Sequence, residues 1–562
     1  MARRVIAGLP GLAWVDRNRP EALVLLLVAI AGAVGLAWGL PGGHSWAADS
    51  ISPRSCGLGA IVETYWPGHY HERPPLHMLV LTVLSLPWIG LAVAQVGVDP
   101  DRLTHVLIEP LPMTGIEITA RLVTLAMAVG VAASTMRLWR RLAGRQAAIV
   151  AGLTIASNAV FIYYAHTGNL DVPALFWTAW CLLEVDRFAT GEIGEQRVLL
   201  LAVAAALTKD QAAGALVVVL PVFLVLLPWL ASRASPLRPA LVRAALLAVG
   251  VYALVSGALI NPVGFWHRLA FLFGPGSQSW AGYQPGAAGA LALIRDAIAA
   301  TPHFTAWPIA VAAGAGVIVA LRRAPPVPRA RLLLPLVAAV SFFVLFDLAA
   351  RRSEDRFLLP VAVLVLPYAG LLWQRASGVA GARIPAAVVL AAGFALAALG
   401  VASVDGTLLV DSRYAAEDFL AALPPGTPIE VYGGPIYLPR IPAGLAAVRP
   451  GIEPIAERQP IAGVAEIVDP AMDPRPRAPE YIVLATELSD VAMTRPPPAS
   501  QPYGLMQYRD ARSRRFLRDL YDGALGYVRV LDSRCALPWP LACRTIHAST
   551  GRDVWIYARV HS

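Results

Sequence analysis

Two acidic residues lie at the ends of apolar stretches, where a carboxylate is costly to retain without a partner or a task. Asp49 follows the first apolar stretch, and Asp171 opens a later one within Asn169-Leu170-Asp171. A carboxylate in such a place can accept a proton from a hydroxyl group. Either residue could instead cap a helix or lie solvated in a loop. We expect Asp49 to be a general base and Asp171 to orient the base or its substrate.

Three cations have surroundings typical of anion ligands. Arg73 precedes two prolines in Tyr70-His-Glu-Arg-Pro-Pro-Leu76, and Arg356 ends a basic cluster at the start of another apolar stretch. Lys209 is the only lysine among 46 basic residues and interrupts a long apolar stretch. A guanidinium can fork two hydrogen bonds to a phosphate, whereas an ammonium is a compact point charge. We predict that all three bind a phosphate group, although Lys209 could simply pair with the adjacent Asp210.

Further polar side chains could contact a substrate. His71 and Glu72 adjoin Arg73, and we assign both to substrate binding; a Glu72/Arg73 anchor at a membrane interface is the alternative. His267 and Tyr283 lie in a segment rich in aromatic residues, Gly and Pro, which could be a lid or an interfacial helix and turn. The histidines around residue 70 could bind a divalent metal, although histidines two positions apart point away from one another.

The composition shows which kind of molecule must position these residues. Of 562 residues, 57% are hydrophobic and 15% are charged, with a net charge of +9. Soluble domains are nearer half apolar and a quarter charged, so a soluble enzyme, a disordered chain and a disulfide scaffold are excluded. The arginines cluster beside apolar stretches, which indicates orientation in a membrane and argues against nucleic-acid binding. The sequence predicts a multi-pass membrane protein.

The apolar stretches predict eleven or twelve membrane crossings within residues 1–402, beginning with Ala22 to Leu40. Arginine-rich segments assigned to the cytoplasm leave outward loops at 41–75, 166–171, 261–303 and 350–356. For Asp49 and Asp171 to face the same side, one stretch must fail to cross. We expect this of 76–95, interrupted by Pro87, and we expect 198–230 to form a hairpin with Lys209 at its apex.

Residues 403–562 are more polar and alternate helical runs with short apolar strands. Examples are Ala415 to Leu423 followed by Ile429 to Tyr432. This pattern predicts a small α/β domain outside the membrane. Cys535 and Cys543 could form a disulfide there in an oxidising compartment; the remaining cysteines are expected to be a packed helix residue, Cys181, and a free thiol, Cys56.

The ordered set of residues resembles a family, the GT-C type membrane glycosyltransferases. Within it, the chain is most similar to bacterial lipid-linked sugar transferases related to protein O-mannosyltransferases and to the aminoarabinose transferase that modifies lipid A. The resemblance covers about the first 400 residues and lies in Asp49, Glu72-Arg-Pro-Pro-Leu76, Asp171, Leu207-Thr-Lys209 and Arg356-Phe-Leu-Leu-Pro360. The family often has Lys where Arg73 stands. The C-terminal domain resembles no particular family.

The resemblance implies transfer of a sugar, usually with inversion, from a polyprenyl-phosphate carrier to a glycan, lipid or protein acceptor. The reaction would occur on the outer face of a bacterial cytoplasmic membrane, with Asp49 as base. Arg73, Lys209 and Arg356 would neutralise the departing lipid phosphate, and Glu72 would position Arg73 or contact the sugar. The rival functions are a transporter or flippase for an anionic or lipid-linked substrate, which would also use charges within the membrane, and a non-catalytic subunit that binds a partner.

Overall fold

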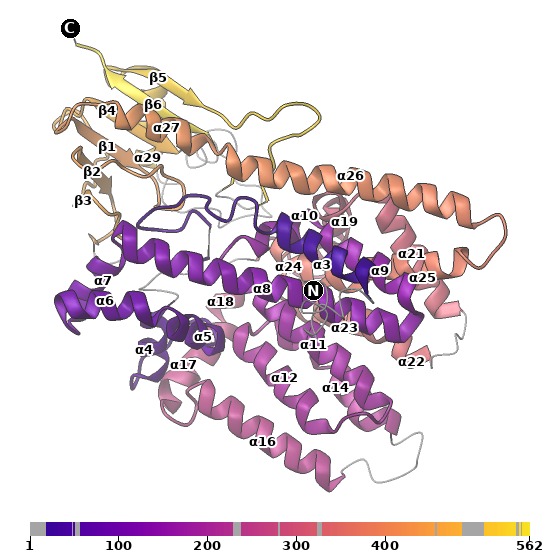
Figure 1. The fold of residues 1–562 in the computed structure, drawn as a ribbon. Coiled ribbons are helices and arrows are strands. Elements are labelled where there is room, and N and C mark those ends of the chain that lie inside the picture. Colours follow the sequence, from indigo (N-terminus) through magenta and orange to yellow (C-terminus); the bar gives the residue numbers. More distant parts are fainter. Residues whose placement is uncertain are drawn as a thin grey trace, which may run out of the picture.

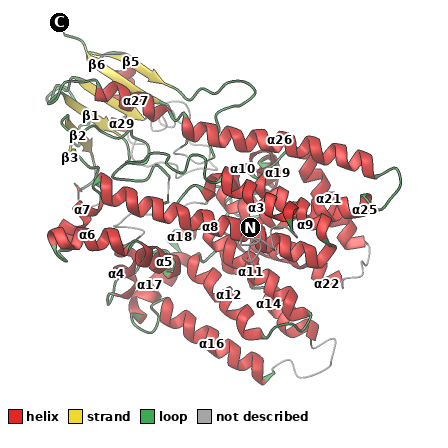
Figure 2. Ribbon diagram, viewed as in Figure 1, coloured by secondary structure: helices red, strands yellow, loops and turns green. Residues whose placement is uncertain are grey.

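The computed structural model describes residues 18–47, 49–50, 57–228, 238–278, 281–322, 329–455, 458–485, 511–546, 550–551 and 553–561. A helical part is followed by a six-stranded sheet domain, and the long helix α26 (Arg383–Leu409) joins them (Figures 1 and 2). The predicted fold class, a multi-pass helical membrane part with a C-terminal α/β domain, is confirmed.

The helical part begins with α3 (Arg19–Ala31), α4 (Leu58–Tyr65), α5 (Leu76–Leu84), α6 (Leu86–Val96), α7 (Pro100–Leu107), α8 (Pro110–Ala143), α9 (Arg145–Ala156), α10 (Ala159–Ala165), α11 (Asp171–Ala189), α12 (Glu195–Thr208) and α13 (Ala212–Leu216). It continues with α14 (Val219–Pro221), η1 (Val222–Leu226), α16 (Pro239–Val255), α17 (Pro262–Phe273), α18 (Pro275–Gln278), α19 (Ala287–Ala299), α20 (Thr301–Phe304), α21 (Trp307–Arg322), α22 (Arg329–Leu332), α23 (Leu334–Phe342), η2 (Phe343–Leu348), α24 (Asp355–Val365), η3 (Leu366–Tyr368) and α25 (Ala369–Ala376).

Fewer helices than expected are long enough to cross a membrane singly. Among the described residues, three helices have the necessary length and apolar character, or five if each of two bent helix pairs is counted as one span. Four further apolar helices have 10–17 residues. Such a helix rises at most about 25 Å, less than the hydrocarbon core of about 30 Å. Apolar stretches in this sequence therefore exceed continuous crossing helices in number, because breaks divide them.

Glycine and proline account for several of these breaks. The expected helix from Ala22 to Leu40 ends at Ala31, and the chain then turns through Gly35 and Gly39, both with positive φ. The stretch 76–95 is divided into α5 and α6, which meet at 68° just before Pro87. Its interruption is therefore present, and its failure to cross the membrane stays a prediction. The 198–230 stretch is broken after Thr208, as expected, and Lys209 has an extended backbone.

The segment 261–303, expected to be a lid or an interfacial helix and turn, is largely helical, and both interpretations stay predictions. It contains α17 and α19, each exposing large apolar side chains, among them Trp266 and Leu291. Asn261 caps α17 and also donates to backbone carbonyls of Trp66 and His69, 2.7 and 2.8 Å away. This side chain ties α17 to the earlier loop.

The C-terminal domain is built on a mixed sheet with the strand order β3-β2-β1-β4-β6-β5. Its strands are β1 (Pro428–Tyr432), β2 (Ala446–Gly451), β3 (Val464–Val468), β4 (Tyr481–Ala485), β5 (Tyr527–Ser533) and β6 (Val554–Arg559). The first four pair in parallel, β6 is antiparallel to β4, and β5 is antiparallel to β6. Helix α27 (Ser412–Ala421) and helix α29 (Ala511–Tyr521) pack on separate clusters of sheet side chains. The predicted α/β domain is thereby confirmed.

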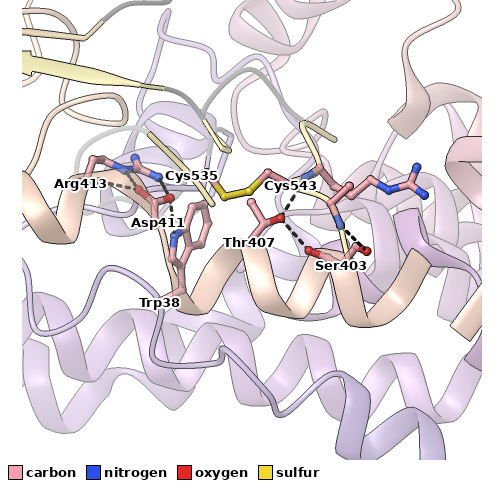
Figure 3. Close-up of a disulfide and its surroundings, with 9 residues drawn as sticks. Trp38, Ser403, Thr407, Asp411, Arg413, Cys535 and Cys543 are labelled. Carbon is pink, nitrogen blue, oxygen red and sulfur yellow. Dashed lines mark hydrogen bonds and ion pairs between the residues drawn. A yellow bond between two sulfur atoms is a disulfide. The ribbon is translucent and has the colours of Figure 1, made fainter. Parts of the chain in front are cut away.

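A disulfide joins Cys535 to Cys543, as predicted, and the loop it closes lies on α26 (Figure 3). The backbone N–H groups of Ala542 and Arg544 donate to Ser403 and Thr407 of that helix, at 3.3 and 2.9 Å. The crosslink therefore holds the α/β domain's last segment against the helix that leads into it. Cys181 is buried in α11, as expected. Cys56 lies outside the described residues.

Candidate active site

Asp49 and two of the predicted phosphate ligands lie together. One carboxylate oxygen of Asp49 is 2.7 Å from Arg73 Nη2, and the other is bonded to Arg356 Nη1. Arg73 also donates to the backbone carbonyl of Asp49 at 3.1 Å. Arg356 is 307 positions away from Asp49 in the chain, whereas Arg73 is 24 positions away. The side chain of Asp49 is 38% exposed, so this cluster is accessible from outside the helical part.

A buried ion pair in α8 holds the turn that carries Asp49. Ser45 and Ser50 both donate to Oε1 of Glu117, at 2.7 and 3.1 Å. Arg121 compensates the charge of Glu117 at 3.0 Å and donates to the backbone carbonyl of Trp38 at 2.8 Å. Between the two serines, Asp49 has a φ of 58°, which is uncommon for a residue other than glycine. The Glu117–Arg121 pair was not predicted, because the sequence shows only two charged residues in an apolar stretch and not what they contact.

The polar residues of the segment before α5 differ in their contacts. Arg73 binds Asp49 and not Glu72, and the anchoring of both residues at a membrane interface stays a prediction. Glu72 is exposed and makes no hydrogen bond or ion pair with any described residue. His71 is buried, and its Nδ1 lies 2.9 Å from Glu63 Oε2. Burial lowers the pKa of His71, although the hydrogen bond to Glu63 opposes this shift.

Asp171 and Lys209 form the second ion pair of the site. Asp171 is the first residue of α11, whose N-cap residue, Leu170, makes no side-chain capping bond. Lys209 directly follows the last residue of α12, and its neighbour Asp210 pairs with Arg268 and not with Lys209. The helix-cap explanation of Asp171 and the local Lys209/Asp210 pair are therefore both wrong. The interruption of the helix at Lys209 brings its ammonium to the start of α11.

A single aromatic ring connects the cations of the two pairs. The ring centroid of Phe357 is 4.6 Å from the Arg356 guanidinium carbon and 5.6 Å from Lys209 Nζ. Arg352 lies 5.4 Å from the same centroid. A ring face attracts cations through its quadrupole. Phe357 therefore helps to hold several like charges near one another.

A small cavity, partly open to the outside, is lined by Asp171, Lys209 and Arg356. Apolar side chains from α11, α13, α23 and α24 make most of the remaining wall, including Leu175, Ala215, Phe342 and Phe357. The cavity thus combines an apolar wall with two cations, each of which has a carboxylate partner. An amphipathic anion suits this combination.

The remaining predicted residues lie apart from these pairs. His267 is exposed, and its ring meets Tyr70 edge-on with centroids 6.4 Å apart. The hydroxyl of Tyr283 bonds to Ser353 and to Asp296, and burial raises its pKa. Arg351 donates to the backbone carbonyl of Tyr283 at 3.1 Å. Tyr283 therefore supports the basic segment before Arg356 and does not face the cavity.

Other ionisable groups near the site were missed by sequence reasoning. Arg268 is buried in α17 and pairs with Asp210, which directly follows Lys209 in the chain. His303 lies 2.9 Å from Asp355, the residue before Arg356, and this hydrogen bond raises the histidine pKa. The apolar surroundings of these residues hid their partners, which are distant in sequence. Within the described ranges, no group of three or more His, Cys, Asp or Glu residues is arranged to hold a metal.

Comparisons with known proteins give similarity of overall structure only. No protein-family model and no curated sequence matches the chain. Its structure is similar to that of ArnT from Cupriavidus metallidurans in the apo state, at 16% identity over 95% of this chain and 98% of that chain, with a TM-score of 0.46. ArnT from the same organism bound to undecaprenyl phosphate gives a TM-score of 0.47 with the same identity and coverage. The Archaeoglobus fulgidus oligosaccharyltransferase tethered with an acceptor peptide is 11% identical over 97% and 89% of the two chains, with a TM-score of 0.46.

Proposed function

We propose that the protein is an integral-membrane glycosyltransferase of the GT-C type. It moves a sugar from a polyprenyl-phosphate carrier to an acceptor on the outer face of a bacterial cytoplasmic membrane. The observation that carries this proposal is the cavity shared by Lys209 and Arg356, whose partners are the two carboxylates Asp171 and Asp49. The ordered sequence motifs point to the same activity independently of this geometry.

The donor's two chemical parts match the two parts of the site. An isoprenoid chain is apolar and suits the side chains of α11, α13, α23 and α24. Its phosphate suits Lys209, Arg356 and Arg73, because charge-assisted hydrogen bonds to phosphate are strong and arginine can make two of them. In the proposal, the phosphate replaces Asp49 as the partner of the two arginines.

That exchange would prepare the base. Released from Arg356, the Asp49 carboxylate accepts the proton of an acceptor hydroxyl, and the hydroxyl oxygen attacks the anomeric carbon of the sugar. The bond from that carbon to the phosphate oxygen breaks, and its electron pair leaves with the lipid phosphate. The cations stabilise the charge that develops on the phosphate, and attack opposite the leaving group inverts the anomeric carbon.

The remaining predicted residues are assigned to the sugar and the acceptor. Asp171 orients the reacting groups from the cavity wall. His71 and Glu72 adjoin Arg73 and offer hydrogen bonds to sugar hydroxyls. His267 and Tyr283, on the outward segment, would contribute to the acceptor side. The acceptor is a glycan, a lipid or a protein, and the α/β domain faces the same outer compartment.

The test is sugar transfer from a set of polyprenyl-phosphate sugars to a crude envelope extract, with the purified protein in detergent. Asp49→Asn should lower kcat by at least about 100-fold, because it removes the proton acceptor. The donor KM should stay the same or fall, since the substitution also removes the anion that competes for Arg73 and Arg356. Asp99→Asn is the matched control, because Asp99 caps α7 and is absent from the cavity lining.

Two other results would lead elsewhere. Equal transfer by the unsubstituted protein and Asp49→Asn would retain the enzyme class and reject Asp49 as its base. Binding of the donors without any transfer, by a protein that remains folded, would reject the glycosyltransferase and favour a transporter or flippase for the lipid-linked sugar.

A further inference from the structure

The loop that carries Asp49 is held by contacts with a residue of the α/β domain, Arg413. The guanidinium carbon of Arg413, in α27, lies 4.0 Å from the ring centroid of Trp46 and 5.3 Å from that of Trp38. Both tryptophans belong to the loop after α3 and are almost completely buried. Trp38 donates its indole N–H to Asp411 at 3.0 Å. Figure 3 shows Trp38 beneath the Asp411 and Arg413 side chains.

Arg413 is fixed within its own domain. Its Nε and Nη2 donate to the two carboxylate oxygens of Asp411, at 2.8 and 2.7 Å, and its Nη1 donates to the carbonyl of Ile436 at 2.5 Å. Ile436 follows the carboxyl end of β1, the edge at which parallel sheets commonly bind ligands. Here the guanidinium at that edge holds a loop of the membrane part.

A second arginine of the α/β domain contacts the same loop. Arg440 lies 5.3 Å from the ring centroid of Trp46 and donates to the backbone carbonyl of Pro41 at 3.0 Å. Its charge is compensated by Glu417 within the domain. The hydroxyl of Tyr414, in turn, accepts from the N–H of Gly39 at 3.1 Å. These contacts span the loop from Gly39 to Trp46.

Trp46 and Asp49 belong to the same part of the loop. Trp46 lies between Ser45, which is bonded to Glu117, and Asp49, three residues further on. Ser50 donates to the same glutamate oxygen, so serines on both sides of Asp49 are bonded to α8. The loop is thus held by α8 on one side and by Arg413 on the other.

We propose that the α/β domain is a positioning part of the active site and acts through Arg413, whose planar guanidinium stacks on Trp46 while it forks onto Asp411. Arg413 does not touch the reacting atoms; it fixes the loop that presents Asp49. A lysine keeps the charge but cannot stack and fork at the same time. The inference rests on the proposed function for its catalytic consequence, whereas its mechanical part concerns the loop alone.

The mechanical part is tested by the reactivity of a thiol in the loop. Ala47→Cys is introduced with Cys56→Ser, and labelling by a water-soluble maleimide is followed by peptide mass. Ala47 is buried, so labelling requires the loop to open. Arg413→Lys should raise the labelling rate about ten-fold or more, because it raises the population of the open loop. Arg477→Lys is the control, since Arg477 pairs with Glu430 and Asp469 inside the α/β domain.

Cys181, buried in α11, reports global unfolding in the same sample. An unchanged rate at position 47, or an equal rise at Cys181, would overturn the proposal. Arg440→Lys provides a milder second variant, for which a smaller rise at position 47 is expected, again without a rise at Cys181.

The catalytic consequence is tested by kinetics in the background that keeps Ala47. Arg413→Lys should lower kcat about 10- to 100-fold through misplacement of Asp49, with the donor KM nearly unchanged. A change confined to KM would overturn the positioning role. If the unsubstituted protein transfers no sugar, the proposed function fails, and the labelling result still decides whether Arg413 holds the loop.

Discussion

Lys209 shows how one side chain can require an ammonium. It is the only lysine of the chain, and its side chain is 17% exposed. Asp171 neutralises it, and the Phe357 ring covers it on another side. An ammonium is compact enough for such a place, whereas a guanidinium is larger and needs a planar set of acceptors.

Replacement of Lys209 should therefore weaken donor binding. Lys209→Met leaves Asp171 without its cation and removes a phosphate ligand, so the Kd of polyprenyl phosphate should rise about 10- to 100-fold, the equivalent of one charged hydrogen bond. Lys209→Arg should recover only part of this loss because of its size. Titration of a fluorescent polyprenyl phosphate into the purified variants measures the effect directly. Full recovery by arginine would show that the charge alone matters.

The residues of the two ion pairs could be singled out from the sequence, and their partners could not. Asp49, Arg73, Asp171, Lys209 and Arg356 are conspicuous because charge is rare beside apolar stretches. The pairing of Asp49 with both arginines depends on contacts between distant segments. Trp46 and Arg413, which fix the loop, have ordinary surroundings in the sequence. His267 and Tyr283 were selected for their chemistry, but neither is among the residues that line the cavity.

At the scale of elements, α8 and the loop after α3 depend on one buried ion pair. Glu117 and Arg121 are completely buried, one helical turn apart, and together they bond both ends of the loop. Loss of one partner from a buried pair leaves the other charge uncompensated. The pair therefore links the stability of α8 to the placement of Asp49.

Glu117→Gln should reduce stability by about 3 to 5 kcal/mol, because Arg121 is left buried without an anion. Arg121→Gln should have a comparable effect, and the double variant should be less destabilised than the sum of the two. Thermal unfolding of the detergent-solubilised protein measures all three. Additive effects would indicate that the two side chains contribute independently and that the pair is not a unit.

The limits of sequence interpretation at this scale lie in the breaks. Apolar stretches were recognised correctly, but the first helix ends at Ala31 before the turns at Gly35 and Gly39, and the turn at Ser85 divides 76–95 into two helices. The average hydrophobicity of a stretch does not show where a single glycine or turn interrupts the helix. The α/β domain was easier to predict, because strand and helix lengths there are ordinary and its runs alternate clearly.

For the whole molecule, the contact between the membrane part and the α/β domain contains a buried histidine. His44 lies in the loop between Pro41 and Trp46, and its side chain is buried. Burial, together with repulsion from the nearby Arg413 and Arg449 of the α/β domain, lowers the pKa of His44 to about 4. The domains therefore fit together around a neutral imidazole.

Acidification should consequently weaken this contact. The pKa of His44 falls from 6.5 in the unfolded chain to about 4 in the fold, so below pH 6.5 the unfolded chain binds a proton that the folded chain does not. The stability present above pH 6.5 is thus lost progressively as the pH falls toward 4, by up to about 3 kcal/mol. His44→Gln cannot take up the proton, so its unfolding midpoint should fall less steeply between pH 7.5 and pH 4.5. His561→Gln, at an exposed histidine, is the matched control and should follow the unsubstituted protein. Parallel curves for all three proteins would mean that His44 is not the group that makes the junction sensitive to acid.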